Sequence, residues 1–328
     1  MSDGNIIQFF IKQFHKSEIL SAEERFSKLI KRLNHICQRN HQLRKRMLSI
    51  TSPLIINISQ NVQLIQFDCS LNSLKQLWHF SNNCNKNSTP PFDALDLYFE
   101  QKQIHKSQDI NRLKKNYLAI CELVPSNLFT DVIESILPSY RQLFVFKKQL
   151  ANQLGLSGMI GSIFSINDRT LDNLFVSIDT GKMYHKKYYP NYNENFQLFQ
   201  SDPVPFRLSR NLKEFIEPFG LLGPMACSMH AISDGIYLKK ESLRDYIQLF
   251  LRDDIVHWSL TPNRSPISSL SQLETTIGSN YQQIIQNAQQ YSPSNLTTNA
   301  HHNLMDLLEK SSSTENFAKL PPTWHPWF

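Results

Sequence analysis

The spacing of apolar residues along this chain changes from short runs near the start to a helical repeat farther on. Residues 6–12 (IIQFFIK) form an apolar run rich in β-branched and aromatic residues, which predicts a buried strand ending at Lys12. A capping box over residues 21–24 then precedes apolar residues at helical spacing up to Cys37, so a helix should follow. Residues 53–67 predict two strands separated by a polar turn. Together these elements predict a small mixed lobe.

A second, mainly helical lobe is predicted after a polar, proline-ended loop at residues 81–91. The helical pattern starts near residue 95, and residues 129–154 predict long amphipathic helices broken near Pro138, because proline cannot continue a helix interior. Further helices are predicted over residues 209–219, 224–236, 242–258, 269–291 and 299–309. The expected fold class is therefore α+β with two lobes.

Between these predicted helices lies the segment that contains the candidate catalytic residues. Residues 158–166 are small and apolar and predict a tightly packed helix that delivers the loop after it. Residues 174–178 and 182–185 predict a β-hairpin, because Asp179-Thr180-Gly181 supplies turn residues between them. The polar, Tyr- and Asn-rich residues 188–202 predict an exposed loop.

Asp168 and Asn173 stand five positions apart in the predicted loop, as the proton acceptor and metal ligand of a phosphotransferase do. Such residues are also common in loops for turn reasons alone. The hairpin that follows should supply a second metal-binding carboxylate, but the chain has His185, Lys186 and Lys187 there. Two cations therefore stand where an anion is required.

Other candidates carry weaker signals. Lys12 on a strand and Glu23 on a helix could form the ion pair that fixes nucleotide phosphates, although a strand-end lysine more often reaches to solvent. His185, His301 and His302 lack further ligands at metal spacing, so no metal site is expected. The aromatic tail at residues 324–328 (WHPWF) predicts docking, either into the protein's own fold or into a partner.

The composition narrows the class of protein. The 328 residues contain no apolar run long enough for a membrane span and no signal-peptide pattern, so an intracellular protein without membrane contact is expected. The five cysteines are scattered and odd in number, which favours reduced thiols. The net charge of +6 arises entirely in residues 1–46, with ten Lys and Arg against four Asp and Glu. Arg44-Lys45-Arg46 ends this segment, which predicts a solvated or partner-facing surface or, alternatively, a nuclear-import or nucleic-acid patch.

Several motifs resemble the carboxyl-terminal region of the phosphatidylinositol 3-kinase-related kinases: SDGNIIQFFIK, AEERFSKLIKRLN, NDRTLDNLFVSIDTGKMYH, PVPFRLSRNLKEFIEPFG, LLGPMACSM, LRDDIVHW and PPTWHPWF. The resemblance covers nearly the whole chain and implies a two-lobed protein-kinase-like fold with a FATC segment at its end. It implies a partial small lobe over residues 1–92, a large lobe over 93–260, a linker helix region over 261–295 and a FATC segment over 296–328. It also implies a fragment or shortened relative that begins after the family's phosphate-covering loop.

Within that family the resemblance assigns the positions of the active site. Lys12 and Glu23 take the places of the nucleotide lysine and its helix acid, Asp168 takes that of the catalytic base, with Arg169 beside it, and Asn173 that of a metal ligand. Active members carry a histidine where this chain has Thr170, and Asp-Phe-Gly where it has Lys187-Tyr188-Tyr189. A unit-charge interaction at about 4 Å is worth roughly 4 kcal/mol at an effective dielectric constant of about 20, so Lys187 should abolish magnesium binding.

The resemblance is closest to family members without catalysis, which implies a pseudokinase scaffold, no enzyme activity and no cofactor. Its partners would be protein subunits of nuclear histone acetyltransferase complexes such as SAGA, together with transcription activators. One alternative is an active atypical serine/threonine kinase that still uses Lys12, Asp168 and Asn173. Another is a basic nucleic-acid-binding module over residues 25–46, but no aromatic residues interleave with its charges, so direct nucleic-acid binding is not expected.

Overall fold

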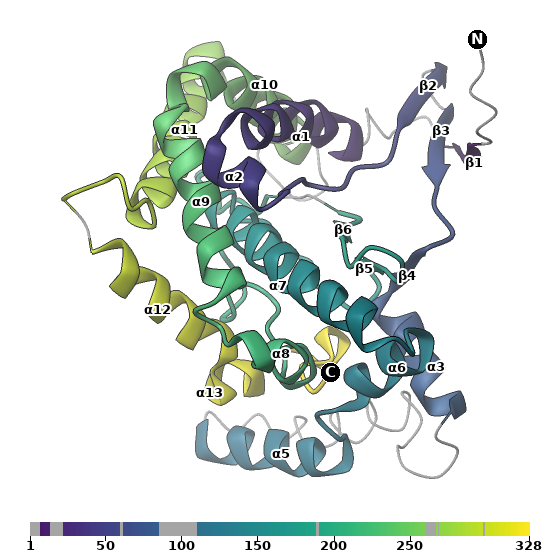
Figure 1. Cartoon of the computed structure of the whole chain (residues 1–328). Coiled ribbons are helices and arrows are strands. Elements are labelled where there is room, and N and C mark those ends of the chain that lie inside the picture. The colour runs from purple at the N-terminus through teal and green to yellow at the C-terminus, as the bar shows by residue number, and fades with distance from the viewer. Residues whose placement is uncertain are drawn as a thin grey trace.

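A computed structural model describes residues 7–13, 22–59, 62–84, 110–187, 190–259, 267, 269–297 and 299–328. Two small sheets lie beside a large group of helices, with the long helix α7 crossing the centre of the molecule and the carboxyl-terminal segment folded in among the helices (Figure 1). This arrangement confirms the predicted α+β fold class. Within the described residues, no helix combines the length and apolar composition needed to span a bilayer.

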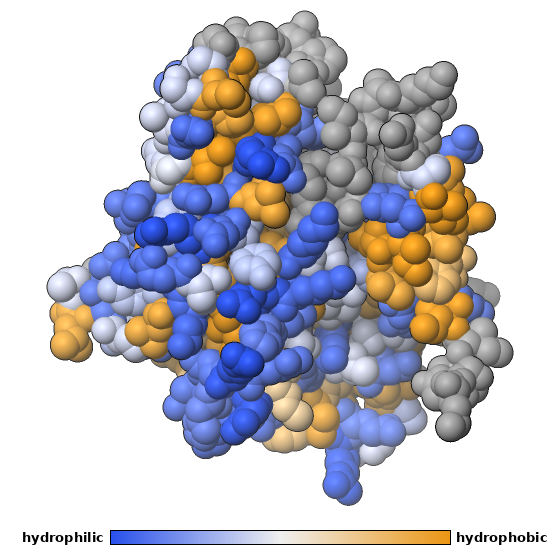
Figure 2. All heavy atoms as spheres, turned by 90° about the horizontal axis from the view of Figure 1, so that it is seen from above, coloured by the Kyte–Doolittle hydropathy of each residue, from blue (hydrophilic) through white to orange (hydrophobic). Residues whose placement is uncertain are grey.

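The first sheet has three antiparallel strands in the order β1 (Gln8–Gln13), β3 (Val62–Phe67) and β2 (Ile55–Ser59). The predicted strands are therefore confirmed, but the predicted burial of the first one is wrong. Ile11, Leu64 and Ile56 lie opposite one another in the register, and Ile11 and Ile56 are 70% and 42% exposed. Apolar side chains gather over these strands on the right of Figure 2. The reason is topological, because among the described residues β1 is an edge strand and none of them covers this face of the sheet.

The second sheet carries the loop with Asp168 and Asn173. It pairs β4 (Leu71–Ser73) with β5 (Leu174–Ser177), and β5 with β6 (Met183–His185), all antiparallel. The β5–β6 hairpin was predicted, and Gly181 at its turn has φ +67°, which glycine adopts at little cost. The strand β4 was not predicted. It ties the segment after the first sheet to the edge of the hairpin.

The helices agree closely with the apolar repeats, and they pack mainly around α7 and α9. Proline at position 138 separates α6 from α7, as predicted, and α7 then continues unbroken through residues 158–163, where a separate helix had been expected. The helices are α1 (Ala22–Arg39), α2 (His41–Lys45), α3 (Leu74–Cys84), α5 (Ile110–Leu123), α6 (Leu128–Ile136), α7 (Tyr140–Ile163), α8 (Arg210–Ile216), α9 (Pro224–Leu238), α10 (Lys240–Ser259), α11 (Leu270–Gln290), α12 (Ala300–Ser312) and α13 (Thr314–Ala318).

The helix α1 does not lie on the first sheet but on the larger group of helices. Its apolar stripe is fully buried, with Phe26 meeting Phe250 of α10 at 5.3 Å and Phe164 at 6.1 Å between ring centroids. Such edge-to-face pairs add to the free energy that burial alone provides. The helix is therefore held by the larger lobe, beside α10 in the upper part of Figure 1.

The segment after the hairpin is only partly exposed, so the predicted exposed loop at residues 188–202 is correct in part for the described residues, which begin at Pro190. Asn193, Glu194 and Asn195 are exposed. Tyr192, Phe196 and Leu198 are all less than 10% exposed. The Asn280 side chain on α11 accepts from the Leu198 amide at 2.9 Å and donates to the Phe196 carbonyl at 2.8 Å. This pair of bonds satisfies two buried backbone groups, which composition alone could not reveal.

Candidate functional site

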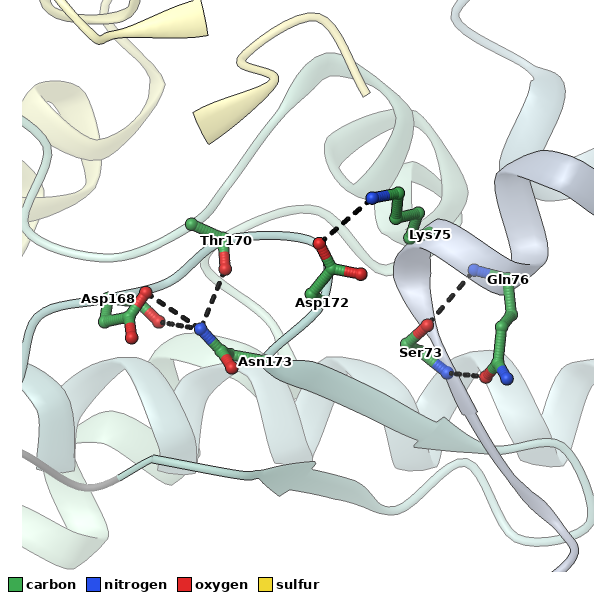
Figure 3. Close-up of polar contacts among 7 residues, drawn as sticks. All are labelled: Ser73, Lys75, Gln76, Asp168, Thr170, Asp172 and Asn173. Atoms are coloured by element: carbon green, nitrogen blue, oxygen red, sulfur yellow. Dashed lines mark hydrogen bonds and ion pairs between the residues drawn. The ribbon is translucent and has the colours of Figure 1, made fainter. Parts of the chain in front are cut away.

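The candidate site is the loop that joins α7 to β5, in the centre of Figure 3. Two residues of the loop adopt the left-handed backbone conformation, with φ 51° at Ser165 and 60° at Asp168. Such conformations are uncommon for residues other than glycine, although aspartate tolerates them better than most. The turn places the Asp168 carboxylate beside the side chain of Asn173, from the end of the same loop.

Asn173 holds the loop closed. Its amide nitrogen Nδ2 donates to Asp168 Oδ1 at 2.8 Å, to the Asp168 carbonyl at 3.3 Å and to Thr170 Oγ1 at 2.8 Å (Figure 3). Asn173 is 5% exposed, so these bonds satisfy a buried amide. The structure thus brings together the predicted catalytic-base and metal-ligand positions, and it binds them to each other.

Lys187, just beyond β6, completes this group. Its ammonium nitrogen lies 3.0 Å from Asp168 Oδ2, and the two side chains are 41% and 35% exposed. The backbone supports the approach, since the Lys186 amide donates to the Asn173 carbonyl at 2.8 Å. Both oxygens of the Asp168 carboxylate therefore have a donor from the chain itself, one from an amide and one from an ammonium group.

The loop is also tied to α3, by contacts that the sequence did not reveal. The Lys75 amide donates to the Leu171 carbonyl at 3.3 Å, and its ammonium nitrogen lies 3.2 Å from Asp172 Oδ2 (Figure 3). The ion pair is largely exposed, so its contribution to stability is at most about 1 kcal/mol. Its effect is to fix the middle of the loop against the start of α3.

Arg169 points away from Asp168 into the protein. Its guanidinium donates to the carbonyls of Ile166, Val204 and Pro205, and burial lowers its pKa to about 10, partly offset by the charge of Asp202. It therefore remains charged at neutral pH. Arg169 is a buried support of the loop rather than a residue facing a substrate.

A second buried arginine, Arg207, links the loop to the end of the chain. Its Nε donates to the Arg169 carbonyl at 2.9 Å, and its two terminal nitrogens donate to backbone oxygens of Trp324, His325 and Phe328. Trp324, Trp327 and Phe328 are at most 3% exposed, so the predicted docking of the tail occurs within the chain's own fold. Arg207 lies in the PVPFRLSRNLKEFIEPFG motif noted in the sequence, but nothing there indicated this role.

His185 lies in the protein interior, close to Arg169 and Arg207. The three line a small cavity of about 20 Å³, enough for about one water molecule. Burial lowers the pKa of His185 to about 3, and the neighbouring Arg169 charge acts in the same direction. A neutral, buried imidazole packed between strand and helix is a structural residue rather than part of a metal site. Within the described residues, no cluster of three potential metal ligands occurs.

The remaining predicted site residues lie elsewhere in the fold. Lys12 is on β1 opposite Gln63, in the first sheet. Glu23 is in the first turn of α1, but its side chain lies outside the described part of the chain. The nucleotide lysine and its helix acid therefore stay predictions. Tyr188 and Tyr189 likewise lie outside the described residues.

The match to a known family covers both the loop and the sheets around it. The family described as phosphatidylinositol 3- and 4-kinase matches residues 12–260, about three quarters of the chain. The chain belongs to the phosphatidylinositol 3- and 4-kinase family. The predicted family is thereby confirmed.

The curated relatives of this family member are large proteins. The SAGA complex/NuA4 acetyltransferase complex subunit Tra1 of Schizosaccharomyces pombe is 26% identical over 99% of the chain, which spans 10% of that relative. The transformation/transcription domain-associated protein (TRRAP) of Homo sapiens is 24% identical over 93% of the chain, which spans 8% of it. The sequence motifs resemble TRRAP, and this match confirms the resemblance. The chain therefore spans about a tenth of the length of these relatives.

Solved structures show the same fold. The FAT and kinase domain of CtTel1 superposes on 100% of this chain with a TM-score of 0.77 and 16% identity, and the match covers 22% of that structure. The kinase-like fold predicted from the sequence is therefore confirmed.

Proposed function

We propose that this chain is a non-catalytic, kinase-shaped scaffold of a TRRAP-like co-activator subunit. The observation that carries the proposal is the ion pair between Lys187 and Asp168, 3.0 Å long. Phosphoryl transfer needs a carboxylate that is available to accept the proton of the attacking hydroxyl, and carboxylate and amide oxygens that hold magnesium. Here the carboxylate is bound by an ammonium group of the same chain.

The side chains of the loop do not form a suitable set of ligands for a divalent cation. Magnesium takes oxygen ligands in a near-octahedral arrangement, usually including carboxylates. Lys187 places a positive charge at the position where the family resemblance expects a second carboxylate, and Asn173 presents its amide nitrogen to Asp168. A metal ion there would face repulsion from the ammonium group in place of attraction. The side chains of Asn173 and Lys187 thus bind the Asp168 carboxylate instead of a metal ion, which supports a structural role for the loop.

The proposed partners follow from the names of the relatives. Tra1 and TRRAP relatives match nearly the whole chain, and Tra1 is described as a subunit of the SAGA and NuA4 acetyltransferase complexes. We extend this to a nuclear location and to protein partners in histone acetyltransferase complexes. The division into a partial small lobe (1–92), a large lobe (93–260), a linker helix region (261–295) and a FATC segment (296–328) belongs to the same proposal.

The test uses the purified chain and measures thermal stability against magnesium, with and without ATP. We expect no magnesium-dependent shift in the melting temperature of the wild type. In the variant Lys187→Asp a carboxylate replaces the ammonium group, and a magnesium-dependent rise should appear because a ligand that binds the folded state stabilises it. The control Lys187→Met removes the charge but supplies no ligand, and it should stay insensitive to magnesium.

The alternative is an active atypical kinase, which the survival of Asp168 and Asn173 side by side favours. Transfer of labelled phosphate from ATP to a protein substrate by the wild type, abolished in Asp168→Asn, would overturn the scaffold proposal. Magnesium-dependent ATP binding by the wild type that is equal to that of Lys187→Asp would show that Lys187 does not exclude the metal.

A further inference from the structure

The helices α1 and α2 carry a concentration of positive charge that the rest of the chain does not balance. Residues 25–67 contain eight Lys and Arg and no Asp or Glu. Because the apolar stripe of α1 is buried against the larger lobe, its polar side turns to solvent, and α2 follows α1 directly in the chain, just below it in Figure 1. Some of these cations are exposed, whereas Arg32 is half-buried over the Tyr246 ring and Arg46 bonds to Gln42 of α2.

Four exposed cations define this surface: Lys31 and Arg39 on α1, and Arg44 and Lys45 on α2. The two on α1 are separated by about 12 Å along the helix, at 1.5 Å per residue. Asn40 then caps α2 by accepting from the amides of Gln42 and Leu43, which fixes the second pair of cations close to the end of α1. We call these four residues, together with Met47, the α1–α2 surface.

The cations of this surface make no ion pair within the described part of the chain. Elsewhere Lys75, Lys147 and Lys187 each lie within 4 Å of a carboxylate of the protein. On the α1–α2 surface the charge is left for solvent or for another molecule. A field of one sign attracts partners of the opposite sign and speeds their association.

Met47 adds an apolar contact at the edge of the charged group. It is 76% exposed, directly after Arg44-Lys45-Arg46. It closes α2 in the left-handed conformation, with φ 51°, while the Met47 amide donates to the Arg44 carbonyl and the Leu48 amide to the Leu43 carbonyl. Glycine is the usual residue at this position of a helix end, because a Cβ atom is strained there. A solvent-exposed methionine in a strained position gains nothing from the fold, which points to a contact outside it.

We propose that the α1–α2 surface binds an acidic protein segment that carries an apolar side chain, with the carboxylates on the four cations and the apolar group on Met47. Nucleic acid fits less well. Phosphates would use the cations, but they would not use Met47, and the surface offers no aromatic side chain for stacking on bases. The inference is independent of the Asp168 loop and does not rest on the absence of catalysis.

The probes are a fluorescent synthetic peptide rich in Glu and Asp with leucines one helical turn apart, the same peptide with serine for leucine, and a short DNA duplex. Binding to the full chain is followed by fluorescence anisotropy at several salt concentrations. The leucine peptide should bind at least about tenfold more tightly than the serine peptide, since burial of each apolar group contributes to the affinity. Its affinity should fall as salt rises.

Two variants test the residues. The triple change Arg39→Gln, Arg44→Gln and Lys45→Gln should weaken binding of the leucine peptide by about tenfold or more. Its matched control changes three exposed lysines outside the surface, Lys213, Lys310 and Lys319, to glutamine, and should leave the affinity within about twofold, because the net charge is equal but the surface is intact.

Met47→Gly separates binding from folding. Glycine relieves the strained backbone, so the variant remains folded, yet it should bind the leucine peptide about threefold to tenfold more weakly and leave the serine peptide unchanged. Three results would overturn the proposal: tighter binding of the DNA duplex than of the leucine peptide, equal binding of the two peptides, or full affinity in both Met47→Gly and the triple variant.

Discussion

The guanidinium carbon of Arg207 lies 3.8 Å from the centroid of the Trp324 ring. The same guanidinium donates to backbone oxygens of Trp324, His325 and Phe328 on one side and of Arg169 on the other. One buried cation therefore joins the carboxyl-terminal tail to the loop that carries Asp168. Segments that are far apart in the sequence become parts of one structural unit at this point.

Replacing Arg207 by lysine should destabilise the fold by about 2–4 kcal/mol. Lysine keeps the charge but lacks the planar set of donors, so buried carbonyls of the tail lose their partners. The measurement is urea unfolding of the wild type and the variant, compared as free energies of unfolding. Burial lowers the pKa of Arg207 to about 9, which leaves it charged at the neutral pH of the experiment.

The control for this change is Arg244→Lys. Arg244 also stacks on an aromatic ring, 5.6 Å from the centroid of Tyr281, but its side chain is 47% exposed and its partner Glu241 is 67% exposed. We expect a much smaller loss of stability than for Arg207→Lys, because exposed ion pairs contribute little. Equal effects of the two lysine substitutions would show that the hydrogen bonds from the Arg207 guanidinium to the tail contribute little to the free energy of unfolding.

Trp327→Ala should be among the most destabilising single changes in the chain. The Trp327 side chain is fully buried, and Phe328 beside it packs edge-to-face on Trp78 of α3, with 5.0 Å between centroids. Removing a buried tryptophan leaves a cavity and typically costs about 3–5 kcal/mol. Thermal unfolding should show the loss. Leu270→Ala, at a residue that is 78% exposed, should leave the melting temperature nearly unchanged.

The tail also shows which parts of the structure could be predicted. Three aromatic residues at the end of the sequence predicted docking, and the apolar repeats predicted the helices from α7 to α12, because burial of one face leaves a period in the sequence. The acceptor of the tail could not be predicted. Arg207 is one of several cations in this part of the sequence, and its function depends on carbonyl groups of the tail that are more than a hundred residues away.

Burial was harder to predict than the elements themselves. The apolar run at β1 gave the correct strand but the wrong environment, because the sequence does not show that, within the described structure, the strand lies at an edge with one face exposed. The segment after Pro190 was interpreted as exposed, yet Phe196 and Leu198 within it are buried and their backbone groups bond to Asn280 of α11. In the site, loop spacing brought Asp168 and Asn173 together correctly. The direct bond of Lys187 to Asp168 required the geometry of the hairpin.

Gly155 on α7 is predicted to tolerate no side chain. A Cβ atom there would lie 2.3 Å from the Met225 carbonyl oxygen of α9, so Gly155→Ala forces two packed helices apart. We expect a loss of at least about 2 kcal/mol in the free energy of unfolding, or failure to accumulate as a soluble protein. Gly278 in α11 is the matched position, because nothing lies within 4 Å of its Cβ site.

Gly278→Ala should therefore stabilise the chain by about 0.5–1 kcal/mol, the difference between glycine and alanine in a helix interior. The two substitutions are chemically identical and differ only in what surrounds them. Opposite signs in urea unfolding would confirm that close contact between α7 and α9 requires a glycine. If Gly155→Ala were as mild as Gly278→Ala, the helices could separate at little cost.

The stability of the fold should fall as the pH decreases below about 6.5. Burial lowers the pKa of His185 to about 3, and burial together with Arg207 lowers that of His325 to about 3. In the unfolded chain each histidine binds a proton near pH 6.5, whereas in the folded chain it stays neutral until about pH 3. The unfolded state therefore gains protons first, and the folded state loses stability over this window.

Each of the two histidines should contribute a loss of roughly 1 kcal/mol between pH 6.5 and 5.5. Urea unfolding at a series of pH values tests this, because the slope of stability against pH counts the protons that only the unfolded state binds. His185→Asn and His325→Asn should each be less stable than the wild type at pH 7.5 but show a shallower slope. His301→Asn, at an exposed position, should leave the slope unchanged. A wild-type slope that persists in both buried variants would assign the acid sensitivity to other groups.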